Sequence, residues 1–100
     1  MARRTTTGTS ITKTRSKVFV DTGGWYAATV PRDRSHKLAI QHYAALLGAD
    51  SLLITSNYVL DETITRLRYD SGHDSTIAFL DRIEEAADRI VAVLGERGLL

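Results

Sequence analysis

The fold class of this chain is decided by the stretch VFVDTGG at residues 18–24. Its first three residues are apolar, two of them are β-branched, and the run stops at Asp21, before two glycines. A short, unbroken apolar run of this kind is typical of a buried strand in a parallel sheet. The residues from Trp25 to Val30 favour a short helix, which Pro31 ends because the residue before a proline is pushed out of the helical region.

The same order of strand and helix repeats along the rest of the chain. Residues 52–54 form a second apolar triplet, residues 90–94 form a third apolar run, and apolar residues between the runs recur at helical spacing. The candidate N-caps of these helices are Ser35, then Thr55, Ser56 or Asn57, then Asp74 or Ser75. Strands separated by helices pair in parallel and are covered by helices on their faces. The sequence therefore predicts an α/β fold with three layers, α/β/α, around a short parallel sheet whose C-terminal side is incomplete.

Length and composition narrow the class of protein. One hundred residues make at most one domain, and shares of 43% hydrophobic and 25% charged residues are ordinary for a globular chain. No apolar run approaches the roughly 20 residues that span a bilayer, so we expect no membrane-spanning protein. The absence of cysteine excludes disulfide scaffolds, thiolate chemistry and cysteine-based zinc sites, and it fits a cytoplasmic location.

The charge is divided unevenly along the chain. Residues 1–17 hold five bases and no acid, whereas residues 18–100 hold eight bases and twelve acids. Eight of the first 17 residues are Ser or Thr and three are apolar, which predicts a disordered basic tail before a domain at residues 18–100. Because this domain is acidic, any affinity for nucleic acid must come from the tail, from local bases or from metal ions.

Two carboxylates are candidates for chemistry. Ligand sites in open α/β sheets lie beyond the carboxyl ends of the strands, and Asp21 follows the first strand directly. Glu62 lies about 200° round its helix from Leu60 and so points away from the apolar stripe. A pair of carboxylates from a strand end and a nearby helix suits a hard cation such as Mg²⁺ or Mn²⁺. Two alternatives stay open: Asp21 caps the next helix, and Glu62 is a solvated acid paired with Arg66 at i, i+4.

Other residues on the same helix, and other motifs, carry less information. Glu62 shares a second, semi-polar face with Tyr58, Thr65 and Tyr69. His36 and His42 lie six residues apart, which is not a chelating spacing on a helix. No serine stands in a G-x-S-x-G turn and no glycine-rich phosphate loop is present, so nucleophilic catalysis and nucleotide binding lack candidates.

Three segments in order resemble a known family. They are VFVDTGGWYAA at residues 18–28, the pair Asp33 and His36 that opens a helix, and LLITSNYVLDETITRLR at residues 52–68. Together they resemble the first two thirds of a PIN domain, a family that includes the toxin ribonucleases of bacterial VapBC toxin–antitoxin systems. The resemblance implies a ribonuclease in which Mg²⁺ or Mn²⁺, held by three or four acidic side chains, activates a water for attack on an RNA phosphodiester.

The resemblance assigns roles to named residues. Asp21 matches the family's first-strand aspartate and Glu62 the glutamate of its third helix, so both are expected to be catalytic metal ligands. Thr22 takes the place of a Ser or Thr that often supports the first acid. The family's remaining acids lie beyond the third strand, where this chain has only Glu96, which we do not assign to the metal. With two carboxylates instead of three or four, metal affinity and cleavage by this chain are expected to be weak.

The resemblance also implies partners, and it leaves alternatives. It predicts an RNA substrate, a cognate antitoxin and a homodimer. One alternative is a chain that is truncated or completed by another chain. A second is a degenerate PIN-like module that acts by binding, for example through its exposed sheet edge. A third is a small nucleic-acid-binding protein that works through its basic tail.

Overall fold

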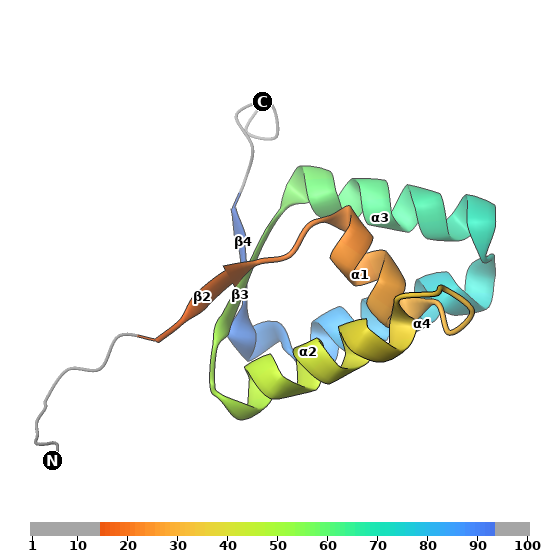
Figure 1. Ribbon diagram of the computed structural model, residues 1–100. Helices are drawn as coiled ribbons and strands as arrows, with labels where there is room; N and C mark the ends of the chain where they lie inside the picture. The colour runs from red at the N-terminus through yellow and green to blue at the C-terminus, as the bar shows by residue number, and fades with distance from the viewer. Residues whose placement is uncertain (1–14, 94–100) are drawn as a thin grey trace, which may run out of the picture.

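The computed structural model describes residues 15–93, and this part of the chain alternates strands and helices (Figure 1). The elements in order are β2 (Lys17–Phe19), α1 (Thr22–Thr29), α2 (His36–Gly48), β3 (Leu52–Ser56), α3 (Asn57–Asp70), α4 (His73–Glu85), the 3₁₀ turn η1 (Ala87–Arg89) and β4 (Ile90–Val93). The predicted α/β class with a short parallel sheet is confirmed. Most of the predicted tail, residues 1–14, lies outside the described residues, as do residues 94–100.

The three strands form one parallel sheet in the order β2-β3-β4. The register places Phe19 beside Ile54 and Ile54 beside Val91, so these three side chains form a row across one face of the sheet. All carboxyl ends of the strands meet at one edge, and α1 and α3 begin there. This edge is therefore where a ligand site is expected.

The two faces of the sheet differ in burial. Leu53 and Thr55 of β3 are completely buried against the helices, whereas Phe19 is 59% exposed and Val91 42% exposed on the opposite face. Right-handed crossovers that step across a sheet in one direction place their helices on the same face, and the described helices lie together beside the sheet in Figure 1. The prediction that the first strand is buried was therefore wrong, because no described helix covers the outer face of β2.

The core is built around Trp25 of α1. Its ring meets Phe79 of α4 at 5.8 Å and Tyr43 of α2 at 6.4 Å, both edge to face. The indole Nε1 donates a hydrogen bond of 3.2 Å to Thr55 Oγ1, whose hydroxyl in turn donates to the carbonyl of Val20. The polar end of the tryptophan is thus satisfied inside the core. These contacts fix α1 over the carboxyl edge of the sheet and place Trp25 in the core.

The helix starts agree in part with the predicted caps. Ser56 caps α3, because its hydroxyl accepts a hydrogen bond from the backbone N–H of Val59 at 3.1 Å. Ser35 precedes α2 as expected, although its side chain makes no capping bond. The prediction that Asp74 or Ser75 caps α4 was wrong, because the helix begins earlier, after Gly72. That glycine has a φ of 88°, a conformation that favours glycine and lets the chain turn from α3 into α4.

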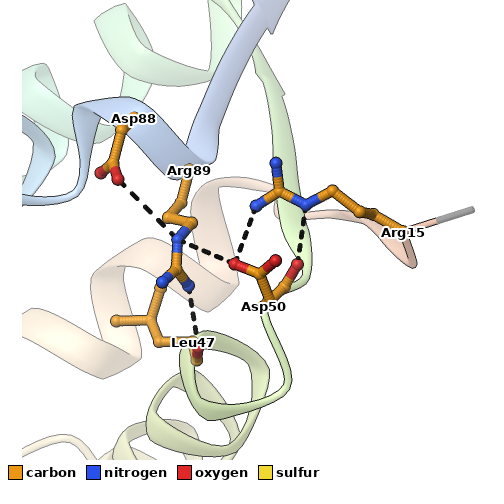
Figure 2. Close-up of polar contacts among 5 residues, drawn as sticks. All are labelled: Arg15, Leu47, Asp50, Asp88 and Arg89. Atoms are coloured by element: carbon orange, nitrogen blue, oxygen red, sulfur yellow. Dashed lines mark hydrogen bonds and ion pairs between the residues drawn. The ribbon is translucent and has the colours of Figure 1, made fainter. Parts of the chain in front are cut away.

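At the opposite end of the sheet, where the strands begin, Arg15, Asp50 and Arg89 form a cluster of ion pairs (Figure 2). Asp50 Oδ1 lies 3.1 Å from Arg15 Nη2 and 3.3 Å from Arg89 Nε, and Arg89 Nη1 also donates to the carbonyl of Leu47 at 2.8 Å. Each of the three residues directly or closely precedes one strand. One carboxylate thus ties the starts of all three strands, at the end of the sheet away from Asp21.

Candidate active site at the carboxyl edge of the sheet

Asp21 lies between the end of β2 and the start of α1. It is the N-cap of α1, and its Oδ1 accepts a hydrogen bond of 3.1 Å from the backbone N–H of Gly24. The alternative that Asp21 caps the next helix is therefore confirmed. Capping occupies one carboxylate oxygen only, and within residues 15–93 Oδ2 makes no hydrogen bond. The cap consequently fixes the direction of an exposed carboxylate whose other oxygen faces solvent.

The second glycine after Asp21, Gly24, has a steric reason to be glycine. A Cβ on Gly24 would lie 3.0 Å from Cγ1 of Val20, which is tighter than nine in ten real Cβ contacts. The first turn of α1 therefore lies directly against the end of β2. A larger residue at position 24 would require the Val20 side chain to shift.

Glu62 does not pair with Arg66, so that alternative was wrong. The Arg66 guanidinium lies over the ring of Tyr26 at 4.2 Å and forms an ion pair of 3.8 Å with Asp70. The Tyr26 hydroxyl donates to the same Asp70 carboxylate at 3.4 Å. Arg66 is thus engaged on the side of α3 that faces α1. The Glu62 carboxylate therefore interacts with a different residue.

The partner of Glu62 is Thr22. The Thr22 hydroxyl donates a hydrogen bond of 2.8 Å to Glu62 Oε1, across 40 residues of sequence. Thr22 is buried, with 8% of its surface exposed, whereas both carboxylates are exposed. The resemblance gave Thr22 the role of supporting the first acid; in the structure its hydroxyl supports the second. Because Thr22 follows Asp21 directly, this bond brings Glu62 to the residue next to Asp21.

Both candidate acids offer carboxylate oxygens, which suit Mg²⁺ or Mn²⁺. Among residues 15–93 no group of three or more potential metal ligands gathers, so the described part of the site offers two acids. The ion pairs of the described residues involve Asp50, Asp70 and Asp88, and none involves Asp21 or Glu62. No described base therefore neutralises the candidate pair, and its negative charge remains available to a cation.

A larger hollow lies away from the two acids. It measures about 540 Å³ and opens between α2 and α4, beside Tyr43 and Arg82. Its lining mixes acids and bases, and it includes neither Asp21 nor Glu62. A smaller, mostly apolar hollow of about 270 Å³ touches Asp21 and is lined by Gly24, Trp25 and His42 among others. His36 lies outside both hollows, with Nδ1 2.8 Å from the carbonyl of Ala27.

Comparison with known proteins finds a similar solved structure. No protein-family model matches this chain, and no curated protein matches it. Among solved structures, the chain is similar to toxin VapC20 of Mycobacterium tuberculosis, which cleaves the sarcin-ricin loop; the identity is 28% and the TM-score 0.63. The match covers 77% of this chain and 55% of VapC20, so the chain spans about half the length of that toxin. This likeness confirms the predicted resemblance to a VapC-type PIN domain.

No described helix is both long enough and apolar enough to cross a bilayer.

Proposed function

We propose that this chain, which has the fold of a VapC-type PIN domain, is a ribonuclease toxin of a toxin–antitoxin pair. Asp21 and Glu62 hold Mg²⁺ or Mn²⁺ at the carboxyl edge of the sheet and are its catalytic residues. The observation that carries the proposal is the 2.8 Å hydrogen bond from Thr22 to Glu62, which brings an acid of α3 to the residue beside Asp21. The relative VapC20 is a toxin that cleaves an RNA loop, which supports RNA as the substrate class.

Each residue has a separate task in this proposal. Asp21 is oriented by the N–H of Gly24 and presents its second oxygen outward. Glu62 is oriented by Thr22, which holds one carboxylate oxygen and leaves the other for a cation. When bound, a divalent cation lowers the pKa of its water and stabilises charge on the phosphate. The protein's contribution is to hold two carboxylates in fixed directions, so that cation, water and phosphodiester meet in one geometry.

The partners and location follow from the same resemblance. We propose an RNA substrate, a cognate antitoxin, a homodimer and a cytoplasmic location. Cleavage by the 100-residue chain alone is expected to be slow, because two carboxylates hold a cation and its water less firmly than three or four.

The test compares two neighbouring acids of α3. Glu62→Gln and Asp61→Asn each remove one negative charge from an exposed position of the same helix. Titration of the purified chain with Mn²⁺ should show weak binding that is lost in Glu62→Gln and in Asp21→Asn but kept in Asp61→Asn. Cleavage of a short single-stranded RNA with Mn²⁺ should follow the same order. Equal effects of Glu62→Gln and Asp61→Asn would mean that overall charge, not a built site, attracts the cation.

A second candidate function is supported by the pair of acids itself. Because no group of three or more potential metal ligands gathers within residues 15–93, a PIN-like module that binds without cleaving is the alternative. This module would bind an antitoxin or an active homologue through the edge of β2 that no described strand covers. It would show no RNA cleavage at any Mn²⁺ concentration, and substitution of Asp21 would leave its binding unchanged. Nucleic-acid binding through the basic tail concerns mostly residues 1–14, and deletion of these residues tests it separately.

A further inference from the structure

The outward face of α3 carries two exposed tyrosines on either side of Glu62. Tyr58 is 47% exposed and stands one turn before Glu62, and Tyr69 is 87% exposed and stands about two turns after it. At 100° per residue, Tyr58, Glu62 and Tyr69 fall with Thr65 within an arc of about 60°. The buried residues Thr63 and Leu67 lie on the opposite side of the helix. The two rings and the acid thus form one continuous exposed stripe.

The other two tyrosines of the chain differ from Tyr58 and Tyr69, because their rings lie under arginine side chains. Tyr26 is buried beneath the guanidinium of Arg66, and Tyr43 lies under Arg82 at 5.0 Å. Tyr58 and Tyr69 have no such ring contact within residues 15–93. Aromatic side chains contribute most when their large apolar rings are covered. Two uncovered rings in line with a candidate catalytic acid therefore point to a ligand with flat apolar faces.

The charge beside the second ring is positive. Arg68 flanks Tyr69 on α3, and in the described part of the chain it forms no ion pair, whereas Arg66 is engaged by Tyr26 and Asp70. Thr65, Arg68 and Tyr69 together line a shallow hollow on the surface of this helix. An unpaired arginine next to an exposed aromatic ring suits a ligand that carries a phosphate next to a flat base.

We propose that this stripe, which we call the α3 track, binds single-stranded RNA by stacking bases on Tyr58 and Tyr69. Arg68 contacts a phosphate, and the backbone between the stacked bases passes Glu62. The proposal rests on the proposed function and deepens it, because it names unpaired bases as the feature that is bound. Bases in a duplex are already stacked and paired, so their faces are not available to a tyrosine. The α3 track therefore favours single-stranded over double-stranded RNA.

The test measures binding in the absence of metal, so that cleavage plays no part. The full chain in EDTA is titrated into a short fluorescently labelled single-stranded RNA, and anisotropy gives the affinity. Tyr69→Ala and Tyr58→Ala should each weaken binding by about 5- to 150-fold, the range found when a stacking ring is removed. Tyr69→Phe should bind nearly as well as the parent chain because it keeps the ring. Leu38→Ala is the matched control, since Leu38 is 56% exposed on α2 and lies off the track.

A second measurement locates the contact directly. RNA that contains 5-iodouridine cross-links on irradiation to aromatic rings stacked on the base. Mass spectrometry of the digested chain should find the cross-link on Tyr58 or Tyr69. A cross-link confined to residues outside α3 would overturn the proposal.

Three further results would overturn it. They are unchanged RNA affinity in both alanine variants, equal affinity for duplex and single strand, and a change of oligomeric state in Tyr69→Ala with RNA affinity unchanged. The last result would assign the stripe to a protein interface. The failure of each proposal is distinguishable. Loss of binding in Tyr69→Ala without any cleavage by the parent chain would refute only the nuclease function. Cleavage that depends on Asp21, together with normal RNA affinity of the tyrosine variants, would refute only the α3 track.

Discussion

Replacing Thr22 by valine tests the one bond on which the candidate site depends. Valine keeps the β-branched shape in a position that is 8% exposed, and it removes the hydroxyl that lies 2.8 Å from Glu62. A hydrogen bond to a charged group contributes about 1.5–3 kcal/mol, but the Glu62 carboxylate is exposed and regains water when the hydroxyl is lost. We therefore expect the free energy of unfolding to fall by about 1 kcal/mol or less, which lowers Tm by about 4–8 °C at most.

The effect of Thr22→Val on metal binding should be larger than its effect on stability. Loss of a group that orients a metal ligand typically weakens metal binding by about 10- to 100-fold. Isothermal titration with Mn²⁺ measures this, and Thr22→Ser should restore binding because it keeps the hydroxyl. Thr29→Val is the control, since Thr29 is an equally buried threonine of α1, 7% exposed, whose hydroxyl donates to the carbonyl of Trp25 and not to Glu62.

A double-mutant cycle with Glu62→Gln completes the test. If Thr22 acts through Glu62, the two substitutions are not additive, and Thr22→Val has little further effect on metal affinity in the Glu62→Gln background. Additive losses, or equal Mn²⁺ affinity in Thr22→Val and Thr29→Val, would refute the reasoning.

Three other predictions concern the framework of the site. Asp50→Asn should cost about 1 kcal/mol or less, because Asp50 is largely exposed, and the loss in urea unfolding should shrink at high salt; a loss independent of salt would contradict an ionic origin. Leu53→Ala, at a fully buried position, should cost about 2–5 kcal/mol, whereas Phe19→Ala should cost less than about 1 kcal/mol because Phe19 is 59% exposed; the reverse order would mean that the faces of the sheet are assigned wrongly. Burial raises the pKa of Tyr43, so the unfolded chain loses the hydroxyl proton at a lower pH than the folded chain does, and the free energy of unfolding should fall as the pH rises past about 10. Tyr43→Phe should reduce this dependence of the unfolding free energy on alkaline pH. An unchanged dependence would exclude Tyr43 as its source.

The sequence predicts those features that depend on local pattern. The alternation of strands and helices follows from apolar triplets and helical spacing, and the position of Asp21 follows from the rule that sites lie at the carboxyl ends of strands. The cap at Ser56 follows from its place between a strand and an apolar stripe.

Features that depend on tertiary contacts could not be predicted from the sequence. Arg66 has an acid four residues before it, Glu62, and another four residues after it, Asp70, so spacing alone cannot choose between them. The ring of Tyr26 decides, because it lies under Arg66 while its hydroxyl binds Asp70. That choice frees Glu62 to accept from Thr22, a bond across 40 residues that leaves no periodic signal. The exposure of β2 could not be predicted from the sequence either. An apolar run predicts a strand buried on both faces of the sheet, and it does not show whether helices cover both faces.

The order of the strands explains why the site is open on one side. Both crossovers step from β2 through β3 to β4, so the helices gather on one face and β2 pairs with a single described neighbour. Asp21 lies at the end of this edge strand, and Glu62 approaches it from α3, which follows β3. If the proposed metal site takes a further carboxylate from beyond the described residues, that carboxylate is expected to approach past β2, where no described strand pairs.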